Sequence, residues 1–245
     1  MAVDIAPGLS EEIMEELKRR LAGNKRIQSL CGTLADGEAT YATAQAMAQA
    51  VGEQTSAVLL QVLRPEVLPD GRMYYNIAQR TIKPALEYSD QFVSTFTDQV
   101  QTSLNQRAGL NVKSISARQP VDTIDNLCGL ASYYEDFNKG LWVLKEPVKT
   151  TINNVVDRTA RANAEFANAA GIKVIIVRTA EPNCCQWCAD LEGTYDYDEV
   201  RAKGSDVYRR HNDCKCVVEY YPGTGNLVQN VHVSHNSAMS WRAFQ

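Results

Sequence analysis

The chain has 245 residues, 44% of them hydrophobic and 22% charged, which excludes a wholly disordered protein and fits a folded globular one. That length can bury one large core or two modest ones, so disulfides are not needed for stability. The formal net charge of -4 gives no overall electrostatic reason to bind nucleic acid, although a local basic patch could still do so.

The amino-terminal stretch M-A-V-D-I-A-P-G-L-S lacks the basic start and the apolar run of a signal peptide. The chain also has no run of about eighteen apolar residues, so we expect no membrane partner. We expect a protein that is made and kept in the cytoplasm. In that reducing compartment, clustered cysteines are more often metal ligands or reactive thiols than disulfides.

Helical patterns occupy the first two thirds of the chain. We predict a helix that opens at Ser10 and stops at Gly23, because glutamates fill its first turns and basic residues its last. A second, alanine-rich helix is expected from about Ala35 to Leu63, where small residues favour close helix packing. Two prolines and an Asp-Gly pair predict a loop over residues 64–72.

Helical spacing resumes over residues 77–106, with Pro84 as a first-turn residue or a kink. Residues 108–119 are expected to form an irregular connection, and residues 121–144 a shorter helix plus a loop. Pro147 then starts another long helix, which stops at Gly171.

Strand-like segments follow Gly171, namely I-K-V-I-I-V-R-T, G-T-Y-D-Y and C-V-V-E-Y-Y. The pattern predicts an α+β protein, with a mostly helical N-terminal region of long helices followed by a small β-containing module. We predict a helical domain over 1–146 and a bridging helix plus a small zinc-binding α/β module over 147–222. The remaining tail, 223–245, is expected to extend along another chain or to be disordered.

Two short runs near the C-terminal end hold five of the seven cysteines and one of the three histidines. The pair Cys185-x2-Cys188 has the spacing of a metal knuckle, and His211-x2-Cys214-x-Cys216 supplies up to three more donors. Thiolates suit a borderline-soft, tetrahedral cation such as zinc. The sequence therefore predicts a structural zinc site in the terminal module.

Five candidate donors compete for four positions in a tetrahedral site. Cys185, Cys188 and Cys214 are expected to bind, while His211 and Cys216 compete for the fourth position. Cys184, beside the knuckle, is expected to lie outside the site. The sequence does not decide between the last two donors.

Other interpretations of the cysteines remain open. The cluster could be a set of buried thiols, or one disulfide with spare thiols. A catalytic zinc would need an open position and an acid or base, for which Asp190, Glu192 and Asp213 are near in sequence. A thiolate-rich site with four or more donors is usually closed, which favours a structural role.

The order of these features resembles the tailed-phage minor head proteins of the Mu protein F type, also called phage head morphogenesis proteins. The likeness covers roughly residues 155–225, and the helical part before it matches the layout of that family. Three motifs carry the resemblance: Arg158 and Thr159, with Ala160 where an acid is common; Cys185, Cys188, Leu191 and Gly193; and His211, Cys214 and Cys216.

The resemblance implies a non-enzymatic minor capsid protein, present in several copies inside the phage head near the portal. Such a protein would assist head assembly or DNA packaging and could leave with the genome. Portal protein, major capsid protein or both would be its partners, with contact to packaged DNA.

The alternative is a metal-dependent nuclease that acts on DNA during packaging or entry, in which Arg209, Arg210 and His211 act on phosphate. A solvated turn is the simpler interpretation of these two arginines. We expect Trp187 to pack over the site rather than stack on a base.

Two further features of the C-terminal end have plain interpretations. His232 and His235 are expected to be exposed rather than ligands. Gly223 and Gly225 are better explained by a turn after Pro222 than by a phosphate-binding loop.

Overall fold

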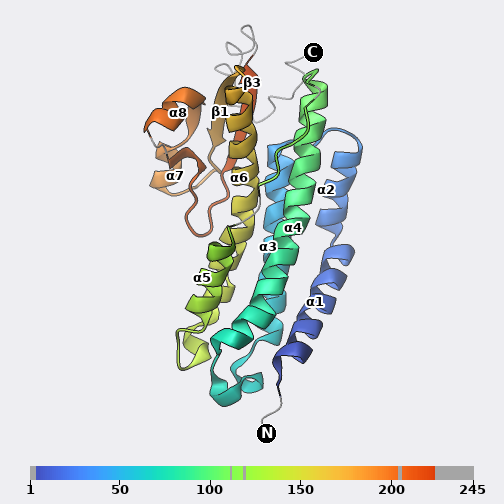
Figure 1. The fold of residues 1–245 in the computed structure, drawn as a ribbon, viewed down its shortest axis with the longest axis vertical. Coiled ribbons are helices and arrows are strands. Elements are labelled where there is room, and N and C mark those ends of the chain that lie inside the picture. Colours follow the sequence, from blue (N-terminus) through green and yellow to red (C-terminus); the bar gives the residue numbers. More distant parts are fainter. Residues whose placement is uncertain (1–3, 111, 118–119, 204–205, 224–245) are drawn as a thin grey trace. The chain divides into compact units, whose positions relative to one another are not determined.

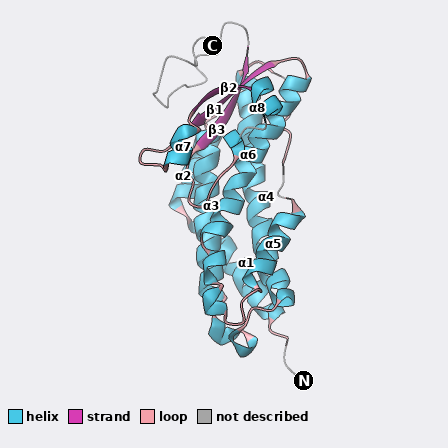
Figure 2. Ribbon diagram, turned by 90° about the vertical axis from the view of Figure 1, so that its left-hand side faces the viewer, coloured by secondary structure: helices cyan, strands magenta, loops and turns pink. Residues whose placement is uncertain are grey.

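The structure is a computed structural model that describes residues 4–110, 112–117, 120–203 and 206–223. Long helices make up most of it, and a small antiparallel sheet follows them near the C-terminal end (Figures 1 and 2). The predicted α+β class is thereby confirmed. No helix in the described ranges is both long and apolar enough to cross a membrane.

The α-helices are α1 (Ala6–Gly23), α2 (Lys25–Ala35), α3 (Tyr41–Val62), α4 (Tyr75–Arg107), α5 (Val121–Ala131), α6 (Glu146–Ala169), α7 (Gln186–Asp190) and α8 (Tyr197–Lys203). The 3-10 turns are η1 (Pro65–Val67), η2 (Pro69–Gly71), η3 (Phe137–Lys139), η4 (Leu141–Leu144) and η5 (Asp206–Tyr208). The strands are β1 (Lys173–Thr179), β2 (Gly193–Asp196) and β3 (Val217–Gly223).

The predicted start of the first helix at Ser10 is wrong, because α1 already begins at Ala6. A carboxylate oxygen of Asp4 accepts a hydrogen bond from the Ala6 amide at 3.2 Å. Pro7 lies in the first turn, where its fixed backbone angle suits a helix and its missing N–H costs nothing. These two signals outweigh Ser10 and its following glutamates.

The predicted helix over 35–63 is also wrong at its start, since α3 begins only at Tyr41. Gly37 has φ +74°, a left-handed conformation that ends α2. The Thr43 hydroxyl then accepts from the Thr40 amide at 3.1 Å and helps to start α3. Helix α2 itself was not predicted; the Asn24 side chain, which accepts from the Ile27 amide at 3.1 Å, was its signal.

The later helices follow the predicted pattern closely. Pro84 lies inside α4 rather than in its first turn, and the helix continues past it. Residues 64–72 form the two short turns η1 and η2, as expected for a loop rich in proline. Gly171, with φ +80°, follows α6 at the predicted stop.

The chain forms two compact units, each assembled from three segments. Unit 1 comprises residues 1–32, 46–93 and 118–155, and unit 2 comprises residues 33–45, 94–117 and 156–245. Helices α2, α3, α4 and α6 contribute residues to both units. The division predicted from the sequence stays a prediction, and its tail lies outside the described residues except for Gly223, the last residue of β3.

Unit 1 has an apolar core formed by residues from most of its helices. The fully buried members include Ile13, Leu17, Leu59, Leu86, Phe137 and Ile152. Gly52 permits close contact between α3 and α6, because a Cβ there would lie 3.2 Å from the Lys149 Cα. This contact is the close packing that the small residues of α3 indicated.

Unit 2 contains the sheet, in the order β2-β1-β3 with both pairings antiparallel. Val174, Ile176 and Val218 are buried in it. Gln101 of α4 donates to the Tyr220 hydroxyl on β3 at 2.7 Å, and its own side-chain oxygen accepts from Tyr41. A buried polar network thus ties the sheet to helices of the same unit.

Candidate metal centre

The first cysteine run lies between β1 and β2. Asn183 adopts a left-handed conformation, φ 67°, which asparagine tolerates better than most residues. Cys185 then caps the N-terminus of the short helix α7, and Cys188 lies within that helix. One helical turn therefore separates the two thiols and places them on the same side.

The second run precedes β3. Asp213 has φ 63°, and the Cys214 amide donates to the His211 carbonyl at 3.2 Å, so the chain turns sharply between these two residues. Cys214 and Cys216 come directly before the strand begins at Val217, and both are buried.

The two runs meet in two groups of potential metal ligands that share Cys188. We call Cys185, Cys188 and His211 the exposed triad, because two of its members are exposed. Cys188, Cys214 and Cys216 form the buried triad. Within each triad the ligand atoms lie within 4.8 Å of one another, so these clusters could hold a metal ion.

Individual separations agree with ligands of one ion. The Cys188 and Cys214 Sγ atoms are 3.7 Å apart, and His211 Nε2 lies 3.3 Å from Cys185 Sγ and 3.1 Å from Cys188 Sγ. Two thiolates on a tetrahedral zinc are separated by about 3.7 Å, given Zn–S bonds of about 2.3 Å. In the described chain no four of these donors all lie within 4.8 Å of each other, so the choice of four ligands stays a prediction.

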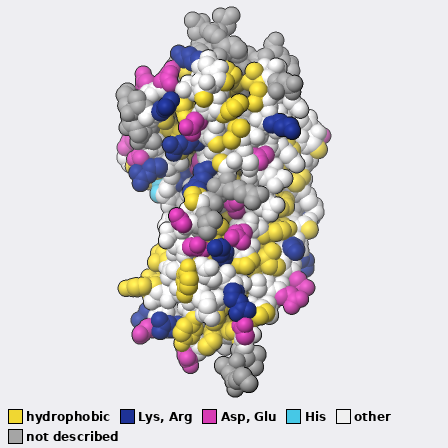
Figure 3. Space-filling view, viewed as in Figure 1, with side chains coloured by type: hydrophobic (Ala, Val, Ile, Leu, Met, Phe, Trp, Pro, Cys, Tyr) yellow, Lys and Arg dark blue, Asp and Glu magenta, His cyan; other side chains and the backbone are white. Residues whose placement is uncertain are grey.

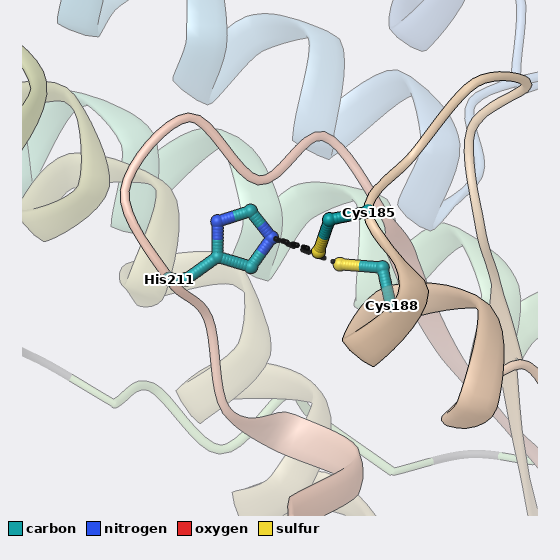
Figure 4. A group of neighbouring side chains, drawn as sticks. All are labelled: Cys185, Cys188 and His211. Atoms are coloured by element: carbon teal, nitrogen blue, oxygen red, sulfur yellow. Dashed lines mark hydrogen bonds between the residues drawn. The ribbon is translucent and has the colours of Figure 1, made fainter.

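The His211 ring is oriented for binding through Nε2. Its Nδ1 lies 2.6 Å from the Asn212 carbonyl, which can only accept, so Nδ1 carries the hydrogen of the neutral ring. Nε2 is then a free acceptor, and Figure 4 shows it directed at the sulfurs of Cys185 and Cys188. A carbonyl partner of this kind is usual for histidines that bind metals.

The thiols of the buried triad are electrostatically unequal. Burial raises the pKa of Cys188. A hydrogen bond from Cys214 to Cys216 raises the pKa of Cys214 and lowers that of Cys216. Protons thus compete for these sulfurs, and a bound divalent cation would displace them because cysteine binds metals as the thiolate.

The solvated turn expected for Arg209 and Arg210 is confirmed for Arg209 and wrong for Arg210. Arg209 is exposed and pairs with Asp206 at 2.9 Å. The Arg210 side chain is only 1% exposed and forms a two-pronged ion pair with Asp157 of α6. It also donates to the Gln45 side chain at 2.8 Å. Arg210 therefore anchors the loop that carries His211 and is closed off from a phosphate in solvent.

The remaining residues singled out in the sequence lie at the edge of the site. Trp187 packs edge-on against the His211 ring, with centroids 5.7 Å apart, as expected of a residue that covers the site. Cys184 packs against the buried cysteines but belongs to neither triad. All seven cysteines are free thiols. Of the acids, Asp190 accepts from Gln186 at 2.7 Å, and no carboxylate of the described chain belongs to a triad.

Sequence reasoning missed two residues of the site, Arg178 and Asp157. Arg178 lies in β1 and is 1% exposed, with its guanidinium beside the buried triad. A charged residue in the otherwise apolar run V-I-I-V-R-T was a signal for it. Asp157 gave no such signal, because one acid in a long helix with mixed charges is ordinary.

Comparisons of the chain with protein-family models, curated proteins and solved structures found no match.

Proposed function

We propose that this chain is a structural minor head protein of a tailed phage, whose C-terminal module is closed by a zinc ion. We call residues 173–223 the metal module. The observation that carries the proposal is the convergence of donors from two runs, with Cys188 and His211 23 residues apart and their ligand atoms 3.1 Å apart.

Zinc is the ion that this donor set suits best. Four sulfurs and one imidazole nitrogen are soft or borderline donors, whereas magnesium and calcium prefer oxygen. The triads contain no carboxylate among the described residues, which also disfavours a hard cation. The 3.7 Å separation of two sulfurs fits tetrahedral coordination.

Two features support a structural role for the ion rather than a catalytic one. The buried triad is shielded from solvent, and the donors outnumber the four positions of a tetrahedral site, so no position need be left for substrate. Arg210, one of the residues that a nuclease would use on phosphate, is engaged by Asp157 in the interior.

The virion role rests on the order of motifs that resembles the phage head morphogenesis proteins. Acidic and basic side chains are interspersed on the face drawn in Figure 3, where no extended basic surface is visible to attract DNA. This distribution gives no electrostatic reason for DNA binding on that face, and portal or major capsid protein is the proposed partner on the strength of the resemblance.

Metal analysis with a nuclease assay tests the site. Freshly purified full-length protein should contain one zinc per chain, and DNA should stay intact with or without chelator. DNA cleavage that His211→Ala abolishes, while circular dichroism shows an intact fold, would overturn the structural assignment in favour of a nuclease.

Co-purification tests the virion role. The full chain, expressed with the portal and major capsid proteins of the same phage, should be retained by one of them through washes at 0.5 M salt, a concentration chosen to be about three times physiological ionic strength. Retention by neither protein would contradict the proposed partner.

A further inference from the structure

The largest fully buried side chain of the metal module is a charged one, Arg178 of β1. In the antiparallel register it lies opposite Val218 of β3 and Gly193 of β2. Its position is therefore fixed by both neighbouring strands. Such a side chain needs partners for up to five N–H groups.

The two terminal nitrogens of Arg178 contact different parts of the site. One donates to the carbonyls of Val207 and Arg209 at 2.6 and 2.8 Å, and these residues begin the loop that carries His211. The other lies 3.8 Å from the sulfurs of both Cys188 and Cys214. The guanidinium thus joins the strand, the histidine loop and the buried triad.

The charge of this guanidinium has no carboxylate partner. In the described parts of the chain no Asp or Glu lies within ion-pair distance of Arg178, in contrast to Arg210. Arginine does not lose its proton in proteins, so burial cannot be relieved by neutralisation. A buried cation without an anion is strongly destabilising.

Two neighbouring groups can offset this charge. The Trp187 ring lies 5.3 Å from the guanidinium carbon, which gives a modest cation–π attraction. The sulfurs of Cys188 and Cys214 become full negative charges when they bind a metal. The arginine is therefore best accommodated when the cysteines form a metal–thiolate centre.

We infer that Arg178 is the counter-charge and the positioning residue of the metal centre, an inference that rests on the proposed zinc site. A divalent ion with three thiolates and a neutral imidazole carries one net negative charge, which a single guanidinium balances. With four thiolates the centre would carry two net negative charges, one of which a single guanidinium would leave unbalanced. Arg210 Nη1 also lies 3.9 Å from Cys214 Sγ, but Asp157 already balances its charge. Charge balance thus favours His211 as a ligand, together with three of the four cysteines in the two triads.

Zinc affinity and cobalt spectra of full-length variants test this inference. Arg178→Gln should bind zinc 10- to 100-fold more weakly in competition with a chromophoric chelator, roughly the range found when residues behind metal ligands are changed. Arg178→Lys keeps the charge but loses the forked geometry of the guanidinium. Its zinc affinity should lie between those of the wild type and Arg178→Gln. Arg209→Gln, at the exposed neighbouring arginine, should bind like the wild type.

Cobalt substitution separates an electrostatic role from a merely structural one. The sulfur-to-cobalt absorption band of Arg178→Gln should shift, and the band of Arg209→Gln should not. A folded Arg178→Gln with wild-type zinc affinity and spectrum would overturn the role of Arg178 alone. Absence of any zinc binding by the wild type would instead overturn the metal site itself.

A crystal structure of the zinc-loaded wild type decides the matter even if the Arg178 variants do not fold. The guanidinium should remain in hydrogen-bond range of at least one ligating sulfur, with no carboxylate beside it. A guanidinium more than about 4.5 Å from every ligating sulfur would contradict the inference, since no N–H···S bond spans that distance.

Discussion

Unit 1 and the metal module are stabilised in different ways. Unit 1 buries large apolar side chains such as Leu17, Leu59 and Phe137 between helices. The metal module has three short strands, and its interior combines apolar side chains such as Val174, Ile176 and Val218 with three cysteines and two arginines. A region of about fifty residues rarely builds a sufficient apolar core of its own. Under the proposed zinc site, a bound ion would supplement this small core.

The largest expected effect is that of Cys188→Ser, since this cysteine belongs to both triads. Zinc binding in a structural site is worth on the order of 10 kcal/mol at neutral pH, so its loss should unfold the metal module. We expect zinc content to fall to background, and amide exchange to rise over 173–223 while the helices of unit 1 stay protected.

The matched control is Cys31→Ser, at the exposed cysteine of α2. This variant should keep its zinc and its exchange pattern. Full protection of the metal module in Cys188→Ser would show that apolar packing suffices there, and would remove the difference between the two regions.

Asp157→Ala should have the next largest effect. It leaves Arg210 buried without its ion-pair partner, which typically costs about 3–5 kcal/mol. Denaturant unfolding monitored at the metal module should show this loss. Asp206→Ala, which removes the exposed partner of Arg209, should cost less than about 1 kcal/mol; equal losses in both variants would mean that Arg210 is not held in the interior.

Leu59→Ala tests the other side of the comparison. Truncation of this fully buried side chain should destabilise unit 1 by about 2–5 kcal/mol through lost contacts and a cavity. Because the cost arises from apolar packing, it should be the same before and after chelator treatment. A cost that disappears with the metal would show that the core of unit 1 depends on the ion.

The smallest expected effect concerns Glu219 of β3. Burial raises its pKa from 4.5 to about 7, against a smaller opposing effect of the hydrogen bond from Tyr221. The folded state therefore holds this proton more tightly than the unfolded state, and stability is lost as the pH rises from about 4.5 through 7. Glu219→Gln should be more stable than the wild type by about 1–3 kcal/mol at pH 8.

Urea midpoints of the wild type and Glu219→Gln at several pH values provide the measurement. The difference should shrink towards zero at pH 5 and grow towards pH 8, and metal loss at low pH affects both proteins alike. A difference that does not change with pH would place Glu219 in solvent in the folded protein.

Periodicity and terminal signals made much of the fold predictable. The three strands, the long helices α4 and α6 and the proline-rich loop lie where apolar spacing, proline and glycine placed them. The errors at Ser10 and Ala35 arose because several residues nearby could start a helix. The Asp4 side chain determines the start of α1, and the left-handed Gly37 separates α2 from α3. Local composition reveals neither feature.

The candidate site was predictable in its donors but not in its surroundings. The spacing of the cysteines and the histidine alone identified the two runs. Two thiols that are one helical turn apart can reach the same ion. Arg178 and Asp157 were not predictable as partners. Arg178 lies only ten residues before Cys188, but its contact with Cys214 spans 36 residues, and the contact of Asp157 with Arg210 spans 53. Pairings of this kind arise from tertiary packing, which a pattern along the chain does not encode.

X-ray absorption at the zinc edge of the freshly purified, full-length protein tests the central claim most directly. We predict one zinc per chain with a first shell of mostly sulfur at about 2.3 Å and one nitrogen at about 2.0 Å. Absence of zinc, or a shell made of oxygen, would contradict the claim that these cysteines close the metal module around an ion.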